Sequence, residues 1–529
     1  MTVEEIQTKL WDMANKLRGT MDASEYKNYI LAFMFYRYLS ETQEKYLVDQ
    51  GLVAPKGDET VNDAYAREAI DDTLDDYKEE LTSGLGYCIL PGDTWSTLTK
   101  KVDDSEVIPS DYQDMFDHFN ENVKMNPNAQ VNFSGVFNDV NLGDSRLGTT
   151  TTERAKALSN IVNLINSVDY KGEDGKDVLG SIYEYLISQF AASAGKKGGE
   201  FYTPHMVSKI MAEIVTDGRN VGDIPFMVYD PTCGSGSLLL AVGSTLHGSG
   251  GIGSVKYYGQ DLNTTTYNLA RMNLMMHNVR YQDMYLSNAD TLARDWPDGP
   301  DKNGIDHPRM FDAIVSNPPY SAHWDNEVSK LKDPRFKDYG RLAPRTKADY
   351  SFLLHGLYHL NDGGTMAIVL PHGVLFRGAA EETIRKSLIE KNQIDTIIGL
   401  PANLFFGTSI PTIIMILKKG AKKDRNIFFI DASNYFTKEK NKNTLEDEDV
   451  KRIVKAYEER KDIDKFAHLA TPEEIKSNEY NLNIPRYVDT SEPEKEVDLD
   501  EVLKQINETR AEKEKLESEI KEQLKILGV

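Results

Sequence analysis

The chain of 529 residues is 40% hydrophobic and 27% charged, the profile of an ordinary globular protein with two to four domains of about 150 residues each. No apolar run approaches the roughly 18–20 residues of a membrane span, the start lacks a secretory leader, and two cysteines cannot form a disulfide framework. We therefore expect a cytoplasmic protein without membrane association. Its net charge of −23 argues against a chain that binds nucleic acid on its own.

The first 150 residues are predicted to form an acidic helical domain. They carry 28 acidic and 13 basic side chains, and apolar residues recur at helical spacing between Ile6 and Leu17. The stretch Tyr29–Leu39 is apolar enough for a buried helix. Turn-forming residues between Gly143 and Thr152 place the domain boundary near residue 150.

Residues 151–490 are predicted to form an α/β domain. Their 41 basic and 44 acidic side chains nearly balance. Short β-rich runs alternate with helical stretches, a pattern typical of βαβ units and of a parallel sheet with helices on both faces. The predicted strands are Phe226–Tyr229, Lys256–Gly259, Asp283–Ser287, Phe311–Ser316, Thr365–Leu370, Ile394–Leu400, Pro411–Leu417 and Asn426–Asp431.

Residues 491–529 are predicted to form a helical tail. They carry 12 acidic and 7 basic side chains, and the helix expected over Val497–Leu527 places leucine and isoleucine residues roughly on one face. Arg510, Lys513 and Glu517 interrupt this face midway, which disfavours a continuous coiled coil.

A glycine-rich turn follows the first predicted strand, with the sequence Asp230-Pro-Thr-Cys-Gly-Ser-Gly-Ser237. Gly234 and Gly236 allow a tight turn and a close approach of the backbone to a ligand. Leu239 stands where the dinucleotide fingerprint has its third glycine, and the Gly-Lys-Ser/Thr of a P-loop is absent. The carboxylate of Asp230 disfavours a phosphate and suits a cationic amino-acid group. The motif by itself also fits a turn without a ligand.

Acidic residues end the next two predicted strands. Asp261 follows Gly259-Gln260 at the tip of the second strand, where α/β nucleoside-binding folds hold ribose hydroxyls. Asp290 follows the third strand, where a carboxylate could accept hydrogen bonds from the exocyclic amine of adenine. Each residue alone also fits an ordinary strand end.

The fourth predicted strand ends in Asn317-Pro318-Pro319-Tyr320. Two prolines lock the backbone and remove amide donors, so that carbonyl oxygens face outward as acceptors. With the Asn317 amide oxygen and the flat ring of Tyr320, they can hold a planar NH₂ group, localise its nitrogen lone pair and so make it a nucleophile. A rigid turn explains the tetrapeptide alone, but ligands in open α/β sheets bind where successive strands end, so the four motifs together predict one site.

At this point the sequence resembles the S-adenosylmethionine-dependent amino-group DNA methyltransferases, and more closely the modification (M) subunits of type I restriction–modification systems. The resemblance rests on the motifs at Asp230–Gly236 and Asn317–Tyr320, on Gly199-Glu-Phe-Tyr-Thr-Pro204, and on Phe35-Tyr-Arg-Tyr-Leu-Ser40 in the helical region. Cys233 departs from the small residue that is frequent there in related enzymes. The resemblance implies a Rossmann-like S-adenosylmethionine methyltransferase sheet with a helical N-terminal domain and a C-terminal helical tail.

The resemblance also implies the roles of the site residues. Asn317, Pro318, Pro319 and Tyr320 would hold N6 of a flipped adenine, with Phe405 or Phe406 stacking on its other face unless that pair is core packing. No metal is expected. The residues implied to surround S-adenosylmethionine are Glu200, Phe201, Tyr202, Thr203, Pro204, His205, Asp230, Thr232, Cys233, Gly234, Ser235, Gly236, Asp261 and Asp290.

Fewer than 100 residues follow Asp431, and they are acidic and helical, so no target-recognition domain is evident. We expect a separate specificity (S) subunit to read double-stranded DNA and a restriction (R) subunit to supply any motor. The resemblance implies that two copies of this chain clamp the specificity subunit. Arg341 and Arg345 lie in a basic loop after the catalytic motif, where DNA backbone would pass, although acidic residues intervene and a solvated loop is an equal alternative.

Three other functions fit parts of the pattern. The Asn-Pro-Pro-Tyr motif can hold any planar amide, so methylation of a protein glutamine competes with methylation of DNA, although the long helical ends would then have no use. Methylation of an RNA base is a second alternative. A nucleotide-binding scaffold without catalysis would make the motif a coincidence.

Overall fold

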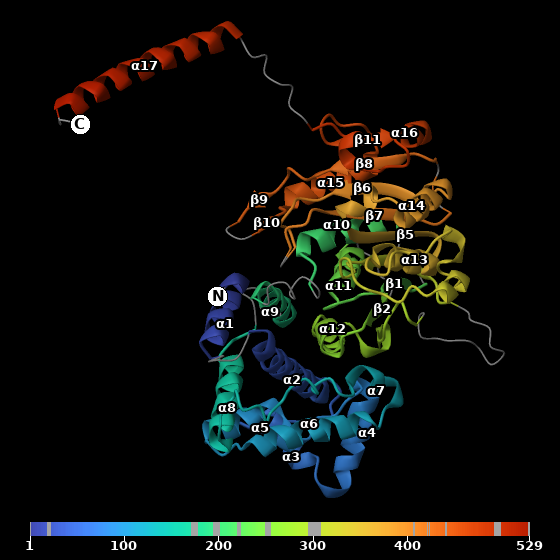
Figure 1. Cartoon of the computed structure of the whole chain (residues 1–529). Coiled ribbons are helices and arrows are strands. Elements are labelled where there is room, and N and C mark those ends of the chain that lie inside the picture. The colour runs from blue at the N-terminus through green and yellow to red at the C-terminus, as the bar shows by residue number, and fades with distance from the viewer. Residues whose placement is uncertain are drawn as a thin grey trace. The chain divides into compact units, whose positions relative to one another are not determined.

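The computed structural model describes residues 2–17, 23–170, 178–193, 202–219, 224–248, 255–294, 308–405, 408–420, 422, 424–439, 442–490 and 499–526. They divide into two compact units, Met1–Val488 and Asp489–Val529 (Figure 1). None of the helices in these ranges combines the length and the apolar character that a membrane crossing requires.

The N-terminal part of the first unit is helical, as predicted. Its central helix is α2, in which the side chains of Ile30, Phe33, Phe35 and Tyr36 are fully buried, because almost every residue of this stretch is apolar. The helices are α1 (Val3–Leu17), α2 (Ala23–Asp49), α3 (Val61–Glu68), α4 (Leu74–Leu85), α5 (Trp95–Asp103), α6 (Pro109–Val123), α7 (Pro127–Phe133), α8 (Thr151–Asn166) and α9 (Leu179–Ser193).

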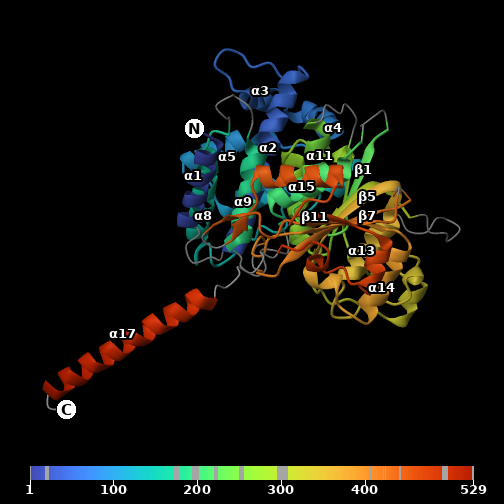
Figure 2. The same cartoon turned by 90° about the horizontal axis from the view of Figure 1, so that it is seen from above.

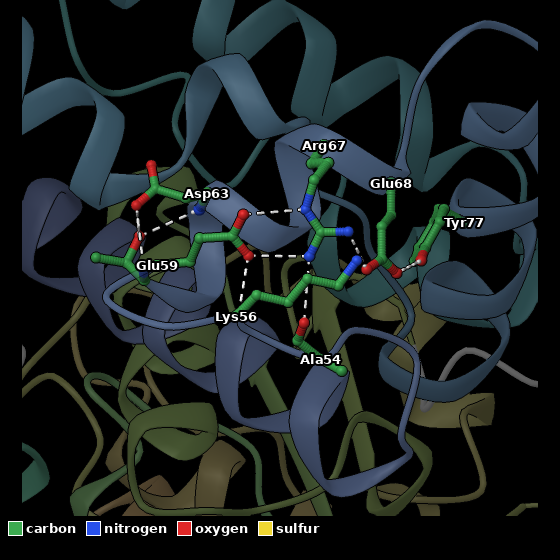
Figure 3. Close-up of polar contacts among 8 residues, drawn as sticks. Ala54, Lys56, Glu59, Asp63, Arg67, Glu68 and Tyr77 are labelled. Atoms are coloured by element: carbon green, nitrogen blue, oxygen red, sulfur yellow. Dashed lines mark hydrogen bonds and ion pairs between the residues drawn. The ribbon is translucent and has the colours of Figure 1, made fainter.

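A small separate core contains residues of α2, α3 and α4, and a polar network forms around Arg67 of α3 (Figure 3). The Arg67 guanidinium donates hydrogen bonds to Glu59 at 2.9 Å, to Glu68 at 2.8 Å and to the Ala54 carbonyl at 3.2 Å. The network fastens the loop between α2 and α3 to α3, although exposed ion pairs of this kind add little to the free energy of unfolding.

Helix α8 begins one residue after the predicted domain boundary, yet it packs against α1, α2, α5 and α6. Helix α9 likewise packs against α1 and α2 and also contacts α12 (Thr264–Met276). The division into residues 1–150, 151–490 and 491–529 therefore stays a prediction, with two helices beyond residue 150 in contact with the N-terminal helices.

A nine-stranded sheet forms the centre of the rest of this unit, in the order β11-β8-β6-β7-β5-β4-β1-β2-β3. All eight predicted strands are present, within a few residues of their expected bounds. The strands are β1 (Phe226–Asp230), β2 (Val255–Asp261), β3 (Met284–Asn288), β4 (Phe311–Ser316), β5 (Leu360–Pro371), β6 (Ile394–Gly399), β7 (Thr412–Lys418), β8 (Ile427–Asp431) and β11 (Ala467–Ala470). A separate ribbon pairs β9 (Thr437–Lys438) with β10 (Asn443–Thr444).

The sheet is parallel from β3 to β5 and between β6 and β8, but β7 and β11 run antiparallel to their neighbours. The expectation of a parallel sheet was wrong at β7, and β11 was not among the predicted strands. The connection from β6 to β7 spans residues 400–411, and its described residues contain no helix that would make a parallel crossover. Strand β7 is buried on both faces and its apolar sequence looks like that of a parallel strand.

Helices cover both faces of the sheet, as predicted (Figure 2). Alternate side chains of each strand face opposite sides of the sheet and so belong to different hydrophobic cores. Val228 and Val315 belong to one core, and Tyr229 and Ile314 belong to the other. The first core includes residues of α10 (His205–Thr216), α11 (Ser237–Gly248), α12 and α15 (Asp447–Glu459). The second includes residues of α13 (Asp349–His359), α14 (Ala380–Glu390) and α16 (Pro472–Ser477).

The described part of the second unit contains one long helix, α17 (Leu499–Ile526). Its side chains from residue 500 onward are exposed. The exposed fractions of Leu503, Leu516 and Ile520 are 55%, 51% and 55%. The predicted helical tail is thus confirmed over the described residues, and none of the described residues of its own unit covers its apolar side chains.

Candidate active site

The predicted motifs meet at the carboxyl edge of the sheet because the four strands that carry them are parallel neighbours. Register pairs Asp230 of β1 with Gly259 of β2, and Asp261 of β2 with Asn288 of β3. Strand β4 lies on the other side of β1 and ends at Ser316, directly before the Asn-Pro-Pro-Tyr segment. The edge therefore gathers acidic residues, a glycine turn and a rigid proline loop.

The glycine turn between β1 and α11 has the conformation that its sequence requires. Gly234 and Gly236 have φ angles of 54° and 80°, in the left-handed region that favours glycine. A Cβ atom at Gly236 would lie 2.4 Å from the Leu274 side chain. The Asn273 side chain, on α12, donates a 2.9 Å hydrogen bond to the Ser235 carbonyl and so fixes the turn from below.

Asp230 is the buried acid of the site. Only 1% of its surface is exposed, and burial raises the pKa of its carboxyl to about 8, with the nearby charge of Asp261 adding to the shift and hydrogen bonds from Thr232 opposing it. Oδ1 accepts the Thr232 backbone N–H at 2.9 Å. Oδ2 is buried and has no hydrogen-bond partner within the described part of the chain. A carboxylate oxygen without a partner fits a positively charged ligand group.

Asp261 and Asp290 differ in their surroundings. Asp261 accepts the Gly234 N–H at 3.1 Å and the Asn263 N–H at 2.8 Å, and burial raises its pKa to about 6 in spite of these bonds. Asp290 is exposed and accepts the Leu292 N–H at 2.9 Å, so its carboxylate closes its own turn. The Thr291 hydroxyl donates to the Pro231 carbonyl at 2.6 Å, which ties this turn to the end of β1.

One small pocket brings together eight of the residues that the sequence singled out. Its lining residues are Tyr202, Thr203, Asp230, Thr232, Cys233, Gly234, Ser235, Ser237, Leu238 and Asn317. Pro204 precedes α10 and is half-buried, whereas His205 is exposed and lines a different cavity, between α10 and α11. Glu200 and Phe201 lie outside the described residues.

Asn317 is held by hydrogen bonds on both sides of its amide. Nδ2 donates to the Thr203 hydroxyl at 3.1 Å, and Oδ1 accepts from the Tyr320 hydroxyl at 2.9 Å. These partners fix which way the amide points and leave a second lone pair on Oδ1 for a further donor. The Ser316 and Thr232 hydroxyls, 2.9 Å apart, link the end of β4 to the glycine turn.

Of the two phenylalanines predicted to stack on the target base, only Phe405 is among the described residues. Phe405 is buried, with 4% of its surface exposed, and its ring stands edge-on to Tyr320 at a centroid distance of 6.1 Å and an interplanar angle of 81°. It therefore supports Tyr320 and does not offer a free face in this arrangement. Phe406 lies outside the described residues.

The basic side chains of the loop after Tyr320 differ in whether they are exposed or bonded to other groups of the protein. Arg341 and Arg345 are exposed, as a role at the DNA backbone requires. Arg335 is buried and donates to Asp333 at 2.7 Å and to the Thr291 carbonyl at 2.9 Å. Lys330 donates to the Leu292 carbonyl at 2.8 Å. Arg335 and Lys330 thus bond to groups of the protein itself, whereas Arg341 and Arg345 are exposed.

Three contributions to the site were missed in the sequence. Thr203 lines the pocket as predicted and also bonds to Asn317, a contact across 114 positions that no local pattern reveals. Asn273 lies inside a helix and supports the glycine turn. Asp349 begins α13 and bonds to the backbone after Tyr320, and its only signal was an acidic residue at a helix start.

Comparison with known families and structures identifies the family of the chain. A family model described as N-6 DNA methylase matches residues 174–496, and one described as the HsdM N-terminal domain matches residues 6–165. The chain is 36% identical to the type I restriction enzyme MpnII methylase subunit of Mycoplasma pneumoniae, over 98% of this chain and 95% of that protein. It is 33% identical to the HindI methylase subunit of Haemophilus influenzae, over 68% of this chain and 81% of that protein.

Solved structures support the same assignment. The type I restriction–modification methyltransferase subunit of Streptococcus thermophilus superimposes with a TM-score of 0.84 and 44% identity, over 93% of this chain and all of that one. A modification subunit of a putative type I restriction enzyme from Vibrio vulnificus shares the fold, with a TM-score of 0.58 and 18% identity over 92% and 97% of the two chains. The chain belongs to the N-6 DNA methylase family and, within it, to the methylase subunits of type I restriction enzymes.

Proposed function

We propose that the chain transfers a methyl group from S-adenosylmethionine to N6 of adenine in double-stranded DNA. This proposal rests on one observation: the buried carboxyl of Asp230 and the amide of Asn317 line the same pocket. The first residue suits the cationic end of the cofactor, and the second suits a planar amino group.

The residues present fit the cofactor. The unpaired Oδ2 of Asp230 would receive its amino group, and the glycine turn would let its methionine part approach the backbone closely. Asp261 would accept hydrogen bonds from the ribose hydroxyls, and the turn at Asp290 would lie near the adenine. When bound, S-adenosylmethionine supplies an electrophilic methyl carbon on a positively charged sulfur.

Asn317 and the loop after it would hold the target base. The free lone pair of Asn317 Oδ1 and the Pro318 carbonyl accept the two hydrogens of N6, which localises the nitrogen lone pair and makes the amino group a nucleophile. Pro319 keeps the loop rigid, and Tyr320 offers its ring to a base flipped out of the duplex. Positioning supplies most of the rate enhancement, so the chain needs no dedicated base.

The described residues after Asp431 form short strands and helices without the sizeable domain that reads a DNA sequence, so we assign recognition to a separate specificity subunit. Two copies of this chain would clamp that subunit, and a restriction subunit would add the motor where cleavage occurs. The exposed apolar side chains of α17 support a docking role for this helix. The two cysteines, Cys88 and Cys233, are buried and unbridged, which fits the reducing cytoplasm.

The experiment that tests this function uses the chain co-expressed with its specificity subunit. Tritiated S-adenosylmethionine is offered with duplex DNA, RNA and protein acceptors, and the labelled product is identified by mass spectrometry. We expect label on N6 of adenine in DNA. Label on a protein glutamine or on an RNA base would refute the proposal.

A further inference from the structure

Asp349 lies outside the predicted site but bonds directly to the catalytic loop. It is the first residue of α13, and 1% of its surface is exposed. Oδ1 accepts the Ser321 backbone N–H at 2.9 Å. Ser321 follows Tyr320 and has a φ angle of 53°, in the left-handed region that residues other than glycine adopt only where their surroundings hold them. Asp349 is the side chain that holds Ser321 in this conformation.

The other oxygen of Asp349 bonds to the turn after β5. Oδ2 accepts from Nη1 of Arg377 at 3.0 Å, and the same nitrogen donates to Glu381 at 3.2 Å. Arg377 lies over Gly373, where a Cβ atom would come within 2.6 Å of its Nε. Because β5 is the neighbour of β4, the Asp349 carboxylate joins the loops that leave two adjacent strands.

Other contacts hold the rest of the catalytic loop. The Ala348 N–H donates to the Ala322 carbonyl at 3.0 Å, and Trp324 donates from its backbone to Arg345 and from its indole to Pro344. The hydrogen bond from Asp349 therefore fixes the start of the loop at Ser321, and the other hydrogen bonds fix the residues that follow.

The position of Ser321 matters because Tyr320 precedes it. The Tyr320 hydroxyl donates to Oδ1 of Asn317, the atom proposed to receive N6. Burial and, to a smaller extent, the charge of Asp349 raise the pKa of Tyr320, so the hydroxyl stays protonated and keeps donating. A displaced Ser321 would move both the ring that stacks on the base and the hydroxyl that orients the amide.

We propose that Asp349 is a positioning residue for methyl transfer, which holds Ser321 so that Tyr320 orients Asn317 and faces the target base, with Arg377 fixing the Asp349 carboxylate. The inference rests on the proposed function. It adds a residue that positions the groups proposed to hold the target base and does not contact the residues proposed to bind the cofactor.

The test compares two substitutions in the assembled complex with its specificity subunit. Asp349→Ala removes both hydrogen bonds, whereas Asp349→Asn keeps an oxygen that can accept from Ser321. We expect Asp349→Ala to lower kcat on the order of 10²-fold, because small misplacements of catalytic groups have effects of this size. The Kd for S-adenosylmethionine should change less than about twofold, since the cofactor residues lie on other loops. Asp349→Asn should recover most of kcat.

Arg377→Gln is the third variant, because Ser321 keeps its acceptor while the carboxylate loses its charged partner. It should lie between the other two in kcat. An unchanged kcat in Asp349→Ala, or an equal loss of kcat and cofactor affinity in folded Asp349→Asn, would overturn the proposal. If the wild type methylates another acceptor, the proposed function fails while the same comparison of kcat and Kd on that acceptor still decides the role of Asp349.

Discussion

Binding of S-adenosylmethionine is predicted to release a proton from Asp230. In the free protein, burial raises the pKa of this carboxyl from its ordinary value of 3.8 to about 8. The folded state therefore binds more protons than the unfolded state between these two values, and the free energy of unfolding falls as the pH rises through this window. A cationic ligand group next to Oδ2 favours the ionised carboxylate and lowers its pKa again.

The size of the effect follows from the position of this pKa. At pH 7 a carboxyl with a pKa of about 8 is protonated in about nine-tenths of the molecules, so close to one proton should leave per cofactor bound. Below pH 8, affinity should rise by up to about tenfold per pH unit, which corresponds to roughly 1.4 kcal/mol. Asp261, with a pKa of about 6, is largely ionised at pH 7 and contributes little to this release.

Isothermal titration calorimetry in two buffers with different ionisation enthalpies measures the number of protons released. Asp230→Asn is the matched control, because its amide cannot lose a proton, and it should release about one proton fewer and bind about 10- to 150-fold more weakly. Asp261→Asn should keep most of the release. Equal proton release by the wild type and Asp230→Asn would refute the role of Asp230 as the buried acid beside the cofactor.

Three further outcomes are expected. Asn317→Ala should lower methyl transfer at least about 10²-fold with cofactor affinity near normal in direct binding measurements, and retained turnover would remove Asn317 from the mechanism. Exchange of Arg341 and Arg345 for Glu should weaken DNA methylation and flatten the salt dependence of DNA binding by about 0.9 in slope per lost phosphate contact; an unchanged slope would place both residues away from DNA. Deletion of residues 497–529 should weaken co-purification with the specificity subunit and leave cofactor binding intact, and unchanged assembly would exclude the docking role.

The sheet and the edge that carries the site could be predicted because their signals are local. Strands with apolar runs alternate with helices. Asp230 and Asp261 end their strands and Asn317 directly follows β4, so parallel pairing alone brings them together. The direction of β7 could not be predicted from its residues, since a strand buried on both faces has the same composition in either direction. The helix-free connection before it was the available signal.

The finer geometry of the site depends on contacts between distant parts of the chain. Thr203 and Asn317 meet because the segment before α10 passes the end of β4, and Asp349 reaches Ser321 from the start of α13. Two arginines of the same loop also differ in burial, because Arg335 is buried and Arg341 is exposed, although the sequence gives no sign of the difference. Such differences follow from tertiary packing, which a local sequence pattern does not contain.

The most direct test of the central claim is nucleoside mass spectrometry of duplex DNA incubated with S-adenosylmethionine and the complex of this chain with its specificity subunit. We predict N6-methyladenine as the methylated nucleoside, with none formed by the Asn317→Ala complex and little by the chain alone. Methylation of cytosine, or methyl transfer to protein with DNA unmodified, would contradict the account.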